Sequence, residues 1–196
     1  MQSAAIKHKL RSDLTMLPKA MRHLPIDERG YPVPALAAWV GGKLFYRPQL
    51  FACALHDRLC WVCGGVLGSF KTFIVDPLCL ITGITGELPL DWDCASWCVC
   101  NRPFKSKPGV IAVAVFRGYK PFRDDVGRHL IRMPIEDDES VVHWYRLGRP
   151  ATRAEVKHSV ETGLPVLVGL ARKQGVDAVF ELENKTRQFQ RWLPAE

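Results

Sequence analysis

The pattern of apolar and polar residues predicts strands in the middle of the chain. The run Val110–Phe116 is almost entirely apolar, which is typical of a central strand buried on both faces. Three further segments are rich in strand-forming residues: 70–75, 129–133 and 141–145. Together these segments predict a small antiparallel sheet in the second half of the chain.

Helices are predicted after this sheet. Thr152 and Glu155 have the spacing of a capping box, in which each side chain bonds the other residue's backbone N–H. We expect the capped helix to end at Gly163 and a second helix to begin at Pro165, because proline is suited to the first helical position. A third helix is expected over residues 177–192.

The first third of the chain has weaker signals. Residues 1–22 are basic, and four apolar residues at near-helical spacing allow a short amphipathic helix there: Ile6, Leu10, Leu14 and Leu17. Residues 39–46 predict a hairpin that turns at Gly41–Gly42. An apolar stripe predicts a helix over residues 48–59, with Cys53 on the stripe and therefore in the core.

Composition is that of a globular protein, with 47% hydrophobic and 24% charged residues among 196. No apolar run approaches the roughly 18 residues that cross a bilayer. The first residues lack the apolar stretch of a secretory signal, so we expect a cytoplasmic protein without membrane contact. In a reducing compartment, seven closely spaced cysteines indicate metal ligands or buried thiols rather than disulfides.

Cys60-Trp-Val-Cys63-Gly-Gly is the most specific motif. Two cysteines separated by two residues and followed by glycine are typical of a zinc knuckle, in which backbone amides point toward the sulfurs. A redox role is disfavoured, because a helix is predicted before Cys60 and two glycines follow Cys63. The alternative to a metal site is a set of buried thiols.

A tetrahedral site needs two further ligands. Cys94 and Cys98 are four residues apart, and Asp91 and Cys94 are three apart, so either pair can share a helix face. We prefer Cys98 as the fourth ligand because thiolate is the softer donor, and keep Asp91 as the alternative. Cys79 and Cys100 are left as either core or site residues.

Five segments in this order resemble a group of uncharacterised bacterial and phage-borne proteins: Leu24–Pro34, Cys60–Gly68, Pro77–Cys79, Asp93–Ala95 and Gly148–Val156. In that group a histidine stands three residues before the cysteine that matches Cys94, and this chain has Asp91 there. A later cysteine of the group is replaced by Arg102, with Cys98 and Cys100 nearby. The resemblance implies a zinc site and a phage or prophage origin, and it implies no activity.

These observations predict an α+β fold: a small antiparallel sheet, a zinc-knuckle centre at about residues 60–100 and a helical C-terminal region. Residues 1–22 are expected to be a basic segment, and residues 23–196 a single domain. Zinc is expected to be structural.

The net charge of +7 is concentrated in two basic segments, 1–22 and 102–132, which flank an acidic centre. The second segment carries the predicted partner-binding residues Arg117, Lys120, Phe122 and Arg123. We expect them to contact an acidic protein surface rather than nucleic acid, because only one aromatic residue is interleaved with the charges.

The preferred function is a non-enzymatic, zinc-stabilised binding module that acts on a host or viral macromolecule, for example as an inhibitor of a host defence complex. A nucleic-acid-binding protein that uses the two basic segments is the first alternative. A zinc-dependent hydrolase or nuclease is the second, although no histidine lies between His56 and His129 to serve as a base near the knuckle.

Overall fold

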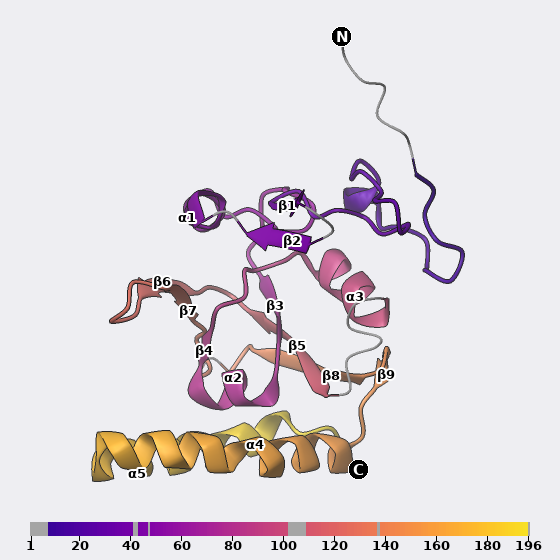
Figure 1. Ribbon diagram of the computed structural model, residues 1–196. Coiled ribbons are helices and arrows are strands. Elements are labelled where there is room, and N and C mark those ends of the chain that lie inside the picture. Colours follow the sequence, from indigo (N-terminus) through magenta and orange to yellow (C-terminus); the bar gives the residue numbers. More distant parts are fainter. Residues whose placement is uncertain (1–7, 41–42, 47, 102–108, 137, 196) are drawn as a thin grey trace.

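The computed structural model describes residues 8–40, 43–46, 48–101, 109–136 and 138–195 (Figure 1). Its largest sheet has four antiparallel strands in the order β3-β5-β8-β9. The bounds of these strands are β3 Lys71–Val75, β5 Val110–Phe116, β8 Val141–Arg146 and β9 Arg149–Pro150. The predicted α+β fold with a small antiparallel sheet and C-terminal helices is confirmed.

Strand β5 is central, as its apolar run predicts. It pairs with β3 on one side and β8 on the other, and nearly all of its side chains are buried. Because successive side chains point to opposite faces, Phe73 and Ala114 join one hydrophobic core, whereas Ile74 and Val113 join a second. The sheet therefore separates two cores.

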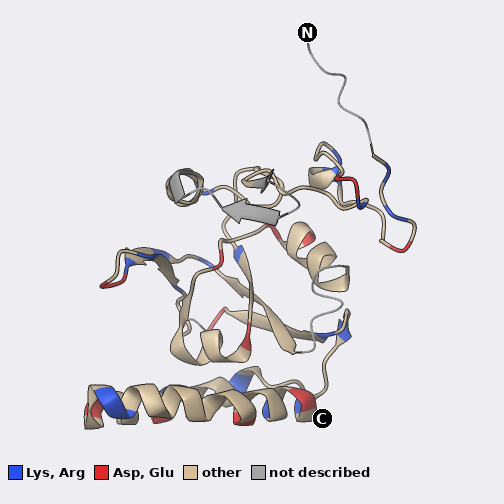
Figure 2. Ribbon diagram, viewed as in Figure 1, with Lys and Arg blue, Asp and Glu red and all other residues tan. Residues whose placement is uncertain are grey.

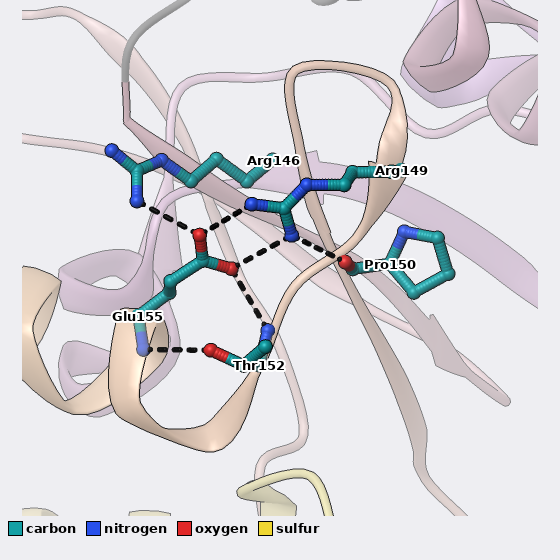
Figure 3. A network of polar contacts seen from close by, with 5 residues as sticks. All are labelled: Arg146, Arg149, Pro150, Thr152 and Glu155. Carbon is teal, nitrogen blue, oxygen red and sulfur yellow. Dashed lines mark hydrogen bonds and ion pairs between the residues drawn. The ribbon is translucent and has the colours of Figure 1, made fainter.

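The first core is covered by helices, which lie below the sheet in Figure 1. These are α2 Pro77–Thr82, α4 Arg153–Gln174 and α5 Val176–Phe189, followed by the short 3₁₀ helix η3 Gln190–Trp192. The predicted capping box is present at the start of α4: Glu155 accepts from the Thr152 N–H at 2.9 Å, and Thr152 Oγ1 accepts from the Glu155 N–H at 3.3 Å. Arg146 and Arg149 also donate to the Glu155 carboxylate, which ties β8 and β9 to the helix (Figure 3).

The predicted break between Gly163 and Pro165 is wrong, because α4 continues through both residues. A proline inside a helix costs about 3 kcal/mol, so packing must offset that loss. Gly163 supplies part of the explanation: a Cβ atom at this position would lie 2.7 Å from Leu78 Cδ1 of α2. The glycine permits close contact between two helices and does not end one.

The second core lies on the opposite face of the sheet, beneath α3 Trp92–Cys100 and η1 Lys19–Met21. The chain before η1 is attached to α3 by polar contacts. The Trp97 indole N–H donates to the Thr15 carbonyl at 3.1 Å, and the buried Asn101 accepts from the Thr15 backbone N–H at 3.0 Å. Residues 8–18 are not helical, and Ile6 of the expected apolar stripe lies outside the described residues.

Two smaller units complete the fold. The first is the predicted hairpin of β1 Ala37–Val40 and β2 Lys43–Tyr46, followed by α1 Pro48–His56, whereas the glycine pair at its turn lies outside the described residues. Cys53 of α1 is exposed, so its predicted place in the core is wrong. The second unit is a three-stranded sheet in the order β4-β7-β6: Ile84–Thr85, His129–Arg132 and Lys120–Arg123. Residues 129–132 thus form a strand as predicted, but in this second sheet.

Candidate metal centre

Four potential metal ligands meet between the knuckle and the start of α3. The sulfurs of Cys60, Cys63 and Cys94 and a carboxylate oxygen of Asp91 all lie within 4.8 Å of one another. The three cysteines are buried and Asp91 is half-buried. The group lies at the edge of the second core, on the face of the sheet away from α4 and α5.

The knuckle itself is a tight antiparallel turn. The Cys60 N–H donates to the Gly65 carbonyl at 2.7 Å, and the Gly64 N–H donates to the Cys60 carbonyl at 2.8 Å. Gly64 has a φ of +74°, a backbone conformation that glycine adopts freely and that is strained for residues with a Cβ atom. The Gly65 N–H then points at Cys63 Sγ, 3.4 Å away. This is the amide-to-sulfur arrangement that the glycines predict.

Asp91 occupies the N-cap position of α3 but does not cap the helix with its side chain. Instead its carboxylate faces the knuckle, where Oδ2 accepts from the Cys63 thiol at 3.2 Å. Its backbone N–H donates to Cys60 Sγ at 3.3 Å. An N-cap aspartate normally satisfies free amides of the first helical turn. Here the side chain is turned toward three sulfurs, as expected of a metal ligand.

Burial and hydrogen bonds between the cysteines shift the pKa values of the three thiols. A hydrogen bond from Cys94 lowers the pKa of Cys60 to about 6, while burial raises the pKa of Cys63 to about 12. The pKa of Cys94 is also raised, first by its hydrogen bond to Cys60 and then by burial. Burial and the proximity of the other cysteines thus oppose a negative charge on every sulfur at once. A divalent cation would supply the positive charge that three thiolates require.

Cys98 lies outside this group. It is one turn further along α3, half-buried, and burial raises its pKa to about 12. The ligand atoms gather at the N-terminus of α3, so the aspartate one position before the helix reaches the cluster and the later cysteine does not. The geometry thus brings together Cys60, Cys63 and Cys94 with Asp91, the alternative ligand, in place of the preferred Cys98.

Cys79 and Cys100, which the sequence places in either the core or the site, are also outside the cluster. Cys79 lies on α2 and packs against the first core, where burial raises its pKa to about 12. Cys100 is the last residue of α3 and packs against the second core.

The predicted partner-binding residues lie on and beside β6, the edge strand of the three-stranded sheet. Figure 2 shows Lys and Arg along the β6–β7 hairpin. Arg117 pairs with Glu139 and lies over the Phe70 ring, with 5.6 Å from its guanidinium carbon to the ring centroid. Arg123 donates to the Gly127 carbonyl at 3.4 Å.

The Phe122 ring is less accessible to a binding partner than its position among charged residues in the sequence indicates. It is half-buried, and the Arg132 guanidinium of β7 lies over its ring at 5.4 Å. Lys120 is exposed and has no acidic partner among the described residues. The cations of this hairpin are therefore surface groups, whereas its single aromatic residue is already covered.

No protein-family description, curated protein or solved structure matches this chain. Within the part of the chain that the structure describes, no helix is both long and apolar enough to cross a membrane. The metal centre must therefore be interpreted from its own geometry.

Proposed function

We propose that this protein is a non-enzymatic binding module stabilised by one structural zinc ion. The observation that carries the proposal is the closed donor set of Cys60, Cys63, Asp91 and Cys94, all within 4.8 Å of one another. Three thiolates favour zinc over magnesium or calcium, which prefer oxygen ligands. One carboxylate is compatible with zinc, which accepts sulfur, nitrogen and oxygen donors.

A structural role fits this site better than a catalytic one. Catalytic zinc is held by three protein ligands and keeps a fourth position open for water, whereas four protein groups converge here. The three cysteines are also buried, so substrate access to the metal would be poor. Zinc would join the knuckle to α3 and so stabilise the second core.

We further propose that the partner is an acidic protein surface, met by Arg117, Lys120, Phe122 and Arg123. Exposed cations on the edge hairpin support this choice. The nucleic-acid alternative is weaker, because single-strand binding uses free aromatic faces and Arg132 covers Phe122. The resemblance to phage-borne proteins favours a partner in a bacterial host cytoplasm, and a host defence complex is the example we prefer.

Elemental analysis of untagged protein tests the metal part of this proposal. About one zinc per chain is expected, as in four-ligand structural sites. A folded protein that carries no zinc, and binds none on addition, would exclude the proposal.

A charge reversal of Arg117, Lys120 and Arg123 to Glu tests the partner part. This triple variant should keep its zinc and its melting temperature but no longer bind an acidic partner. Tight binding of random-sequence DNA by the unchanged protein at physiological salt would favour the nucleic-acid alternative. In that case the salt slope should fall by roughly 0.9 for each phosphate that the variant no longer neutralises.

A further inference from the structure

A groove lies beside the basic hairpin and was not anticipated from the sequence. It has a volume of about 670 Å³ and runs between β6–β7 and α5, with the end of α2 behind it. That volume is within the range of roughly 300–1,000 Å³ that is usual for ligand-binding sites. The groove is on the opposite side of the sheet from the metal centre, because its lining includes α5 of the first core.

The groove combines an apolar floor with cationic walls. Residues 133–135, which follow β7, line it: Met133 and Ile135 are buried in the first core, and Pro134 between them is half-buried. Four cationic side chains and two acidic ones line the walls: Arg117, Lys120, Arg132, Lys185, Glu136 and Glu181. The cations come from the segment before β6, from β6, from β7 and from α5, so three separate elements and a connection direct positive charge into one space.

Some of these charges are already neutralised within the chain. Lys185 pairs with Glu181 one turn earlier on α5, and this hydrogen bond, together with the charge of Arg132, lowers the pKa of Glu181. Arg117 pairs with Glu139 outside the groove. Lys120 is exposed and takes part in none of the ion pairs among the residues described, so its charge is available to a ligand.

We propose that this groove binds an acidic, extended segment of a partner protein, with an apolar side chain of that segment on the Met133–Ile135 floor. The proposal rests on the proposed function and specifies where its acidic partner docks. Charge complementarity selects the acidic segment, and the apolar floor selects a peptide over a purely ionic ligand.

The groove shares Arg117 and Lys120 with the partner-binding surface of the proposed function. Arg132 and Lys185 line the groove, whereas Phe122 and Arg123 do not. A comparison of Arg123 and Lys185 variants can therefore distinguish binding in the groove from general attraction to the basic hairpin. Both residues carry the same charge, but only Lys185 lines the groove.

The test uses the full-length, zinc-loaded protein and a fluorescein-labelled peptide in which glutamate and leucine alternate. Binding is measured by fluorescence anisotropy at low and at physiological ionic strength, since screening weakens exposed charge pairs. Two matched peptides carry glutamine in place of every glutamate or alanine in place of every leucine. The protein variants are Lys120→Glu, Lys185→Glu, Arg123→Glu outside the groove, and Lys173→Glu on α4 as a remote control. Zinc content and melting temperature show that each variant is folded.

We expect saturable binding of the glutamate–leucine peptide, no saturable binding of either matched peptide, and a weakening of about tenfold in Lys120→Glu and in Lys185→Glu. Should Lys185→Glu be unstable because it places two glutamates one turn apart, Lys185→Gln serves in its place with a smaller effect. Binding that falls in Arg123→Glu but not in the Lys185 variants overturns the groove and leaves the proposed acidic partner intact. An equal weakening in Lys173→Glu, or no saturable binding by folded protein, also overturns it. Absence of zinc would instead contradict the proposed function itself.

Discussion

Cys63 donates its thiol hydrogen to the carboxylate of Asp91 at 3.2 Å, across 28 residues of sequence. The contact joins the knuckle to the start of α3 and places an oxygen among three sulfurs.

Asp91→Ala should lose zinc, whereas Cys98→Ala should retain it, because only the aspartate is a member of the ligand cluster. Asp91→His should bind zinc at least as well as the unchanged protein, since imidazole is a common zinc ligand. Elemental analysis of untagged protein measures all three. Zinc loss in Cys98→Ala with retention in Asp91→Ala would restore Cys98 as the fourth ligand.

Cys60→Ser should unfold or aggregate the protein. Structural zinc contributes on the order of 10 kcal/mol to the folding of small zinc peptides, and the remaining buried thiols would have no cation between them. Cys53→Ser is the matched control, because Cys53 is exposed on α1 and outside the cluster. Thermal unfolding monitored by circular dichroism compares the two. Similar melting temperatures for both variants would mean that the cluster does not support the fold.

Glu155→Gln should lower the melting temperature at neutral pH by about 2–4 °C, the range typical of a weakened helix cap in a chain of this size. Hydrogen bonds from Arg149 are the largest cause that holds the pKa of Glu155 well below its usual value. The hydrogen bond from the Thr152 amide is the next largest. A depressed folded-state pKa stabilises the protein above the unfolded pKa of about 4.3, and the gain disappears as pH falls through the folded value. The difference between the two proteins should therefore shrink below about pH 4. Glu161→Gln, on the exposed surface of the same helix and outside the capping box, is the matched control.

Gly169→Ala should stabilise the protein by up to about 1 kcal/mol, because alanine favours the helix and a Cβ atom there would have open space. Gly163→Ala should bring no gain, since its Cβ would lie 2.7 Å from Leu78 Cδ1 and force α4 and α2 apart. Urea unfolding measures both free energies. Equal stabilisation of the two variants would show that the α2–α4 contact adapts freely.

Local signals in the sequence predict several features correctly. The apolar run of β5 predicts a strand with neighbours on both sides, and Thr152 and Glu155 predict a capped helix. The two glycines after Cys63 predict a knuckle whose amide faces a sulfur. Each of these features depends on residues that are close in sequence.

Features that depend on distant contacts are predicted less well. Gly163 and Pro165 have the local pattern of a helix boundary, but α4 continues through both, with Gly163 packed closely against Leu78 of α2. Ligand softness favours Cys98, yet the knuckle approaches the N-terminus of α3, where Asp91 joins the cluster of possible ligands and Cys98 does not. The cationic groove is not visible in sequence because Lys185 and Lys120 are brought together only by the docking of α5.

The contact between Cys63 and Asp91 also has a consequence for the unfolded chain. A metal bound at both positions would close a loop that contains β3, α2 and β4. By analogy with a disulfide, a loop of this length limits the conformational entropy of the unfolded state by an amount equivalent to about 3–4 kcal/mol. Within that loop the paired hydrogen bonds between Thr72 and Leu90 attach the outer side of β3 to the segment before α3. Removal of the ion would thus loosen the chain on the outer side of β3, away from β5. Amide hydrogens of β3 should then exchange with solvent sooner than those of β5, which has a strand on each side.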